Sequence, residues 1–166
     1  MNTWIEILKN DDYDSALKYI EDGADSNEAN ETGESVLACA LKYRCSIALV
    51  QLLIKCDADI FDFDNEGVSI FDMAVTYNNI EMVKYLIEHG IDVNKTDRRS
   101  GFTSLMAAAC YGRNEVVRLL LEYGADKNLA DTKGFSAIDF ARKMNKKSIL
   151  KLFDYDLNTP KNSRRT

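Results

Sequence analysis

The sequence predicts an all-α solenoid of about five helix–turn–helix repeats joined by short β-hairpin-like loops. Three columns of residues recur every 33 or 34 positions. Three columns in register at one such period are the signature of a protein built from repeated supersecondary units. The first column is Gly33, Gly67, Gly101 and Gly134. The second is Ser35, Ser69, Thr103 and Ser136, and the third is Asp25, Asp59, Asp92 and Asp126.

The most regular copy is the segment 101–128, GFTSLMAAACYGRNEVVRLLLEYGADKN. Its pattern predicts a small-residue helix over about 103–111, a break at Gly112 and an apolar helix over about 114–122. The motifs G-x-T-x-L-x-x-A-A and G-x-x-E-V-V-x-L-L-L-x-x-G-A-D-x-N resemble an ankyrin repeat, and a period near 33 is typical of that family. The resemblance covers roughly residues 3–154 and implies an ankyrin-repeat solenoid.

The period divides the chain into a single ankyrin-repeat domain over 1–156 and a basic tail. The expected units are an N-terminal cap at 1–29, repeats at 30–62, 63–95 and 96–129, a C-terminal cap at 130–156, and a flexible tail at 157–166. The hairpin before the third repeat is one residue longer than the others, and the extra residue falls within 97–100. Insertions in repeat proteins lie in loops on one face, which is often the binding face.

Several positions depart from the family's pattern. Arg44 and Asp57 stand where the family places glycine, and no copy contains the T-P-L-H tetrapeptide. The resemblance implies that the missing histidine removes hydrogen bonds between repeats, so we expect modest stability with an unchanged fold. Ser35 and Ser69 are predicted to cap the helices that follow them, because a serine hydroxyl accepts from free N–H groups of the first turn.

Composition excludes several classes of protein. Hydrophobic residues make up 46% and charged residues 29%, as in a globular domain. No apolar run approaches the ~20 residues of a membrane helix. The first residues, MNTWIEILKNDD, do not resemble a signal peptide. Because the four cysteines show no disulfide-framework spacing, we expect reduced thiols and a cytoplasmic location.

No catalytic, metal or cofactor motif emerges from the sequence. The single histidine, His89, ends a predicted helix, where capping explains it better than catalysis. Neither a phosphate-binding glycine loop nor clustered cysteine and histidine ligands are found. We therefore expect a non-enzyme without cofactor.

Charge changes sign along the chain. Residues 1–34 carry a net charge of −8 and residues 135–166 carry +5. In a rod-like solenoid this gradient becomes a dipole that orients a partner. The alternative is that terminal repeats carry charge only to remain soluble.

A column of large side chains marks the candidate binding surface. Tyr43, Tyr77 and Tyr111 are 34 residues apart, and Met144 follows after 33. The repeat pattern does not require an aromatic residue there, and tyrosine is enriched at interface hot spots. The alternative is that the rings pack within the chain.

The resemblance implies partner contacts at the hairpin tips, after the repeat glycine and at the end of the first helix. The candidate partner-binding residues are Tyr43, Tyr77, Tyr111, Met144, Phe102, Phe135, Arg98, Arg99, Lys133, Lys143, Glu31, Glu34 and Glu66. In this hypothesis the basic members meet an acidic part of the partner. The acidic members set the register.

The predicted function is a non-catalytic protein–protein interaction module that binds a partner on its concave face as an adaptor, inhibitor or enzyme helper. We expect a monomer without membrane association. The alternative is a nucleic-acid-associated factor that uses the basic C-terminal repeat and tail, although a pI near 4.9 opposes it. A further alternative is an enzyme with an unrecognised site.

Overall fold

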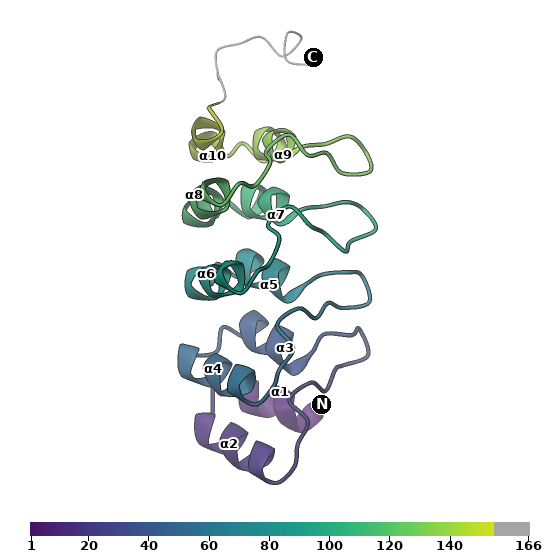
Figure 1. The fold of residues 1–166 in the computed structure, drawn as a ribbon, viewed down its shortest axis with the longest axis vertical. Coiled ribbons are helices and arrows are strands. Elements are labelled where there is room, and N and C mark those ends of the chain that lie inside the picture. The colour runs from purple at the N-terminus through teal and green to yellow at the C-terminus, as the bar shows by residue number, and fades with distance from the viewer. Residues whose placement is uncertain (155–166) are drawn as a thin grey trace.

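Helix pairs stack along the long axis of the molecule in the computed structural model, which describes residues 1–154 (Figure 1). This arrangement confirms the all-α ankyrin solenoid. The predicted tail, 157–166, lies outside the described residues. The helices are α1 (Asn2–Lys9), α2 (Tyr13–Glu21), α3 (Val36–Lys42), α4 (Ile47–Lys55), α5 (Ile70–Thr76), α6 (Ile80–Glu88), α7 (Ser104–Tyr111), α8 (Asn114–Glu122), α9 (Ala137–Lys143) and α10 (Lys147–Leu152).

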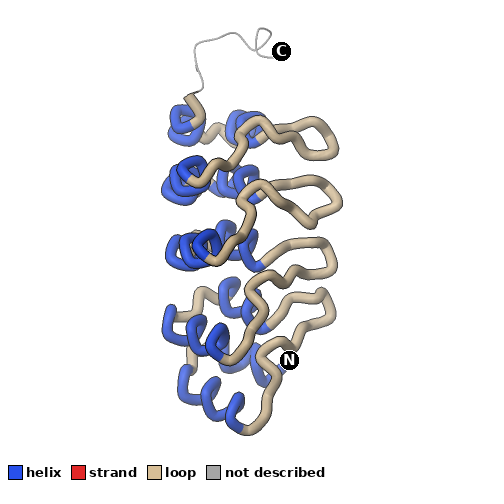
Figure 2. The backbone as a smooth tube through the Cα atoms, in the orientation of Figure 1, coloured by secondary structure: helices blue, strands red, loops and turns tan. Residues whose placement is uncertain are grey.

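The loops between successive pairs project to one side of the stack (Figure 2). Three of them close with a single antiparallel bridge, Ala29 with Ser35, Phe63 with Ser69 and Ala130 with Ser136. The longer loop before α7 closes differently. There the Thr96 hydroxyl donates to the Phe102 carbonyl at 2.9 Å and accepts from the Arg98 N–H at 3.2 Å. The inserted residue therefore changes how this hairpin is held.

Hydroxyl side chains start the first helix of each pair after the first pair. As predicted, Ser35 and Ser69 accept hydrogen bonds from the N–H groups three residues later. The Asp72 carboxylate accepts a hydrogen bond from the Ser69 N–H, and this second bond completes a capping box. The turns between paired helices need a left-handed residue. Gly112 supplies it between α7 and α8 with φ 69°. In the equivalent turn between α3 and α4, Arg44 adopts φ 58°, a conformation that is unfavourable for a residue with a Cβ.

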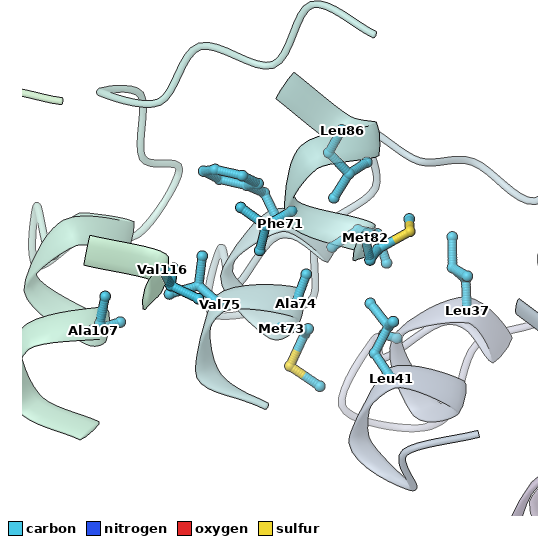
Figure 3. Packing of buried hydrophobic residues seen from close by; sticks show 14 of the residues in the cluster. Leu37, Leu41, Phe71, Met73, Ala74, Val75, Met82, Leu86, Ala107 and Val116 are labelled. Carbon is cyan, nitrogen blue, oxygen red and sulfur yellow. The ribbon is translucent and has the colours of Figure 1, made fainter. Parts of the chain in front are cut away.

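The core lies between the stacked pairs (Figure 3). Small residues on α7, such as Ala107 and Ala108, are buried and let neighbouring helices approach closely. Larger side chains such as Leu86 and Val116 fill the space beside the second helices. No helix in residues 1–154 has both the length and the apolar character needed to cross a bilayer.

Asparagine clamps tie successive loops together. The Asn94 amide donates to the Gly124 carbonyl at 3.0 Å and accepts from the Asp126 N–H at 2.7 Å. Asn27 makes the same two bonds to residues 57 and 59 of the next loop, at 2.8 and 2.7 Å. Each clamp satisfies one backbone donor and one acceptor, so it fixes the spacing between two neighbouring repeats.

One junction lacks this clamp. Phe61 occupies the position equivalent to Asn27 and Asn94, and a phenyl ring cannot form these hydrogen bonds. The second helices on either side of this junction, α4 and α6, also contact each other less than the other neighbouring second helices do. We call this junction, between repeats 30–62 and 63–95, the unclamped seam.

The clamp should contribute measurably to stability. Asn94→Ala removes two hydrogen bonds and leaves the Gly124 carbonyl and Asp126 N–H without a side-chain partner. We expect the free energy of unfolding, measured by urea titration, to fall by about 1–2 kcal/mol. Asn128→Ala is the matched control, because Asn128 is exposed and its amide has no hydrogen bond within residues 1–154. Equal losses in the two variants would contradict the clamp.

Candidate functional site

The four side chains of the predicted column sit at the same end of four stacked helices. Tyr43, Tyr77 and Met144 are the C-cap residues of α3, α5 and α9, and Tyr111 is the last residue of α7. The column is not uniform. Tyr43 and Tyr77 are partly buried against the core, whereas Tyr111 is 54% exposed and Met144 is 50% exposed. The open part of the column is therefore its C-terminal half.

Arginine and lysine side chains lie over two of these rings. The Arg113 guanidinium is 5.9 Å from the centre of the Tyr111 ring, and the Lys9 ammonium is 5.8 Å from that of Tyr43. Arg113 also donates from Nε and Nη2 to the Thr76 carbonyl, at 3.1 and 2.8 Å. Sequence reasoning missed Arg113. Its signal was its position, two residues after Tyr111 and next to the turn glycine.

An open hollow of about 530 Å³ adjoins Tyr77. Arg44 and Arg113 line it together with Tyr77, and Glu81 also lines it. The hollow is therefore bounded by an aromatic ring and by charged groups of both signs.

A second aromatic group lies near the C-terminal hairpins. Phe102 is partly buried and meets Phe140 edge to face with ring centres 5.1 Å apart. Phe135 is exposed, and its ring centre is 6.2 Å from that of Phe140. Phe140 therefore joins the two predicted site residues into one cluster.

Arg98 points into the structure. Its Nε lies 3.4 Å from the Asp72 carboxylate, which is only 2% exposed, and its guanidinium is 5.2 Å from the centre of the Phe102 ring. The Ser104 hydroxyl of the next repeat donates to the same carboxylate at 2.7 Å. Asp72 stands where the family's tetrapeptide has histidine. An aspartate network therefore bridges these two repeats, where the sequence suggested only a lost histidine network.

The remaining charged candidates lie mostly on the surface. Arg99, Lys133 and Lys143 are exposed, as are Glu31 and Glu66 at the hairpin tips. Arg99 and Glu66 line one hollow of about 360 Å³, so the structure brings charges of opposite sign together there.

Glu34 is held by an ion pair. The Lys42 ammonium lies 2.8 Å from its carboxylate, and the Glu34 side chain is 16% exposed. Burial alone raises the pKa of Glu34. Hydrogen bonds from Lys42 and Asn30 and the lysine charge outweigh that effect, so the pKa lies below its ordinary value of 4.5. The hydrogen bond to Glu34 raises the pKa of Lys42 above 10.5.

The histidine considered for catalysis lies at a helix end and contacts the helix itself. His89 is the C-cap of α6, where its Nδ1 lies 2.7 Å from the Tyr85 carbonyl and its ring stacks on Tyr85. Within residues 1–154, no group of histidine, cysteine, aspartate or glutamate side chains is arranged to hold a metal ion.

The stacked helix pairs and projecting hairpins define a helical repeat solenoid. A family model described as ankyrin repeats (3 copies) matches residues 5–97 and 95–162. The chain therefore belongs to the ankyrin repeat family. Ankyrin repeats are in general protein–protein interaction modules, and the family is typically non-catalytic.

Several known proteins are similar to parts of the chain. A putative ankyrin repeat protein, FPV031, of fowlpox virus is 32% identical over 51% of this chain and 26% of its own length. The p105 subunit of nuclear factor NF-kappa-B from Gallus gallus is 36% identical over 52% of this chain and 9% of its own. The E3 ubiquitin-protein ligase hecd-1 of Caenorhabditis elegans is 40% identical over 63% of this chain and 4% of its own length. The chain thus spans about a quarter or less of these relatives.

The Asp72 network predicts a large effect of one substitution. Asp72→Ala leaves the Arg98 charge and the Ser104 hydroxyl without their acceptor inside the stack. We expect the free energy of unfolding to fall by about 3 kcal/mol in urea titration. Asp139→Ala is the matched control, because Asp139 forms the same capping box and pairs with Arg142 of its own helix, but its side chain is a third exposed and within residues 1–154 it receives no bond from another repeat. Its expected loss is about 1 kcal/mol, and a similar loss at Asp72 would refute the network.

The Glu34–Lys42 pair predicts a pH-dependent contribution. The lowered pKa of Glu34 gives stability that is present above pH 4.5 and is lost as pH falls through the folded-state pKa. The raised pKa of Lys42 gives stability that is present below pH 10.5 and is lost at higher pH. Since both side chains are partly exposed, we expect Glu34→Gln to cost about 0.5–1 kcal/mol at neutral pH.

The measurement is urea unfolding of wild type and variant at pH 7 and at pH 3. The two proteins should differ at pH 7, and the difference should shrink toward pH 3 as the wild-type carboxyl takes up a proton. Glu66→Gln serves as the control, because Glu66 is exposed at a hairpin tip. A difference that persists unchanged at pH 3 would show that the ion pair is not its source.

Proposed function

We propose that this chain is a non-catalytic protein-binding module that holds an extended segment of a partner protein along its concave face. The observation that carries the proposal is the exposure of Tyr111 and Met144 beside Arg113. Large rigid side chains that remain half exposed in a folded repeat gain free energy when a partner covers them. An arginine over the ring adds a donor for the partner's acidic or carbonyl groups.

The charges around the column indicate the chemistry of the partner. Lys143 ends α9 next to Met144, and Arg99 and Lys133 extend the basic surface along the hairpin tips. An acidic segment with an apolar side chain would place its carboxylates on these residues and its apolar group on Tyr111. Glu31, toward the N-terminal end, repels the acidic segment, and Glu66, which shares a hollow with Arg99, limits how far the segment extends in that direction.

The inward position of Arg98 refines this assignment. Because its guanidinium is engaged by Asp72 and Phe102, Arg98 positions the hairpin, and Arg99 is the side chain free to meet a partner. Phe102 is covered on one side by the same guanidinium, so Phe135 offers the more accessible ring.

The relatives are consistent with a binding role. They are a putative ankyrin repeat protein of a virus, a subunit of a nuclear factor and an E3 ubiquitin-protein ligase, so their names share no single reaction. The common element is the repeat array, which supports a role as an adaptor, inhibitor or enzyme helper.

We further propose that the chain acts as a monomer in the cytoplasm. Burial raises the pKa of Cys39 to about 11 and of Cys45 to about 12, as expected for unreactive structural thiols.

The test is a variant at the most exposed ring of the column. The partner is first recovered by affinity purification from the native cell, and its dissociation constant is measured by calorimetry. Tyr111→Ala should weaken binding at least about tenfold, as for an interface hot spot. Tyr123→Ala is the matched control, because Tyr123 is 51% exposed but ends the second helix, α8. Unchanged affinity of folded Tyr111→Ala, or recovery of nucleic acid alone, would refute the proposal.

A further inference from the structure

We propose a second docking surface at the unclamped seam, which takes a cationic peptide segment of another protein through one apolar anchor side chain. It lies around Phe61 and Phe63, on the loop between α4 and α5. It uses none of the residues assigned to the concave face. The proposal is therefore independent of the function proposed above.

The missing clamp leaves backbone groups for a ligand to bind. At the other junctions an asparagine bonds one carbonyl and one N–H of the following loop. At the seam the equivalent groups are the Gly90 carbonyl and the Asp92 N–H. Within residues 1–154 no side chain bonds either group. A peptide main chain carries one donor and one acceptor per residue, so it supplies the same chemistry as the absent asparagine.

A hollow with both apolar and polar walls adjoins these groups. Its volume is about 200 Å³; Ile60, Phe61 and Ile91 form its apolar side, and the polar side is lined by Ser69, Gly90, Asp92, Lys95 and Asp97. Phe71, at the start of α5, forms part of its wall. For comparison of size, a closed cavity of about 150 Å³ lined by apolar side chains holds a benzene molecule. The hollow therefore has room for one aliphatic or aromatic side chain.

Two phenylalanine side chains of this loop are exposed, and one of them, Phe61, lines the hollow. Phe61 is 55% exposed and Phe63 is 52% exposed, and only one residue separates them. At the positions equivalent to Phe63, other copies have Ala29 and Ala130. The repeat fold does not need phenylalanine at either position, so folding does not account for these rings. Covering them with an apolar group removes this surface from water.

The charge around the rings selects a cationic partner. Residues 57–66 contain five acidic residues and no lysine or arginine. Asp92 and Asp97 add negative charge to the wall of the hollow, and the one lysine there, Lys95, lies 3.5 Å from Asp97 and is partly neutralised. Lysine or arginine residues beside the anchor would be attracted to this surface and oriented by it. Two copies paired through this same surface would bring like charges together and repel each other.

The test uses three fluorescein-labelled twelve-residue peptides with the ¹⁵N-labelled protein at physiological salt. The first peptide alternates lysine and glycine around a central leucine. The second replaces that leucine with serine, and the third replaces every lysine with glutamate. Fluorescence anisotropy gives each dissociation constant, and amide chemical shifts locate the contact. We expect the first peptide to bind at least about tenfold more tightly than the others and to shift the amides of Ile91 and Asp92.

Two variants and a control separate docking from folding. Phe61→Asn inserts the residue that its siblings carry, and we expect it to close the seam, keep the fold and weaken the first peptide at least about tenfold. Phe63→Ser should weaken it without restoring the clamp. Leu129→Asn, which changes an exposed apolar residue of another hairpin, should alter binding by less than about twofold.

Three outcomes would overturn the proposal. The first is equal binding of the lysine and glutamate peptides, or no binding of either. The second is unchanged binding to folded Phe61→Asn. The third is a dimer in sedimentation experiments that Phe61→Asn dissociates, because the occupant would then be a second copy. None of these results depends on Tyr111, so the concave-face proposal succeeds or fails separately.

Discussion

Burial between neighbouring repeats is the constraint on which the rest of the structure depends. A pair of helices of nine residues or fewer cannot bury an apolar face by itself, so each pair is stable only against the next one. Close stacking requires small side chains such as Ala107 on the first helices and satisfied backbone groups in the loops. The Asn27 and Asn94 clamps meet the second requirement, and the Asp72 carboxylate adds a side-chain bond from Ser104 of the next repeat.

Because the contacts run only between neighbours, a change at one junction remains local. Replacing the clamp asparagine by Phe61 leaves one seam looser without altering the helices on either side. The same substitution moves apolar surface outward and exposes two backbone groups. The weakened junction and the proposed ligand site therefore have the same physical origin. A protein with a single continuous core would tolerate such a substitution less easily.

The fold was predictable because its signals are local and repeated. Spacing alone gave the helix pairs, the serine caps and the Tyr43–Tyr77–Tyr111 column. Side-chain direction was not predictable. Arg98 turns inward because the buried Asp72 of the preceding repeat attracts it. The pattern of one repeat does not reveal this contact between two repeats. The sequence alone could have singled out Phe61, because it interrupts a column of asparagines. The role of that column became clear only from the hydrogen bonds that Asn27 and Asn94 form in the structure.

Charge and shape together explain why two surfaces on one small rod need not compete. The acidic residues near the unclamped seam lie in the N-terminal half, whereas Lys143 and Arg113 surround the exposed part of the tyrosine column in the C-terminal half. A cationic segment is attracted to the first surface and repelled by the second, and an acidic segment behaves in the opposite way. In these two proposals, the charge gradient along the stack assigns each surface a different class of partner.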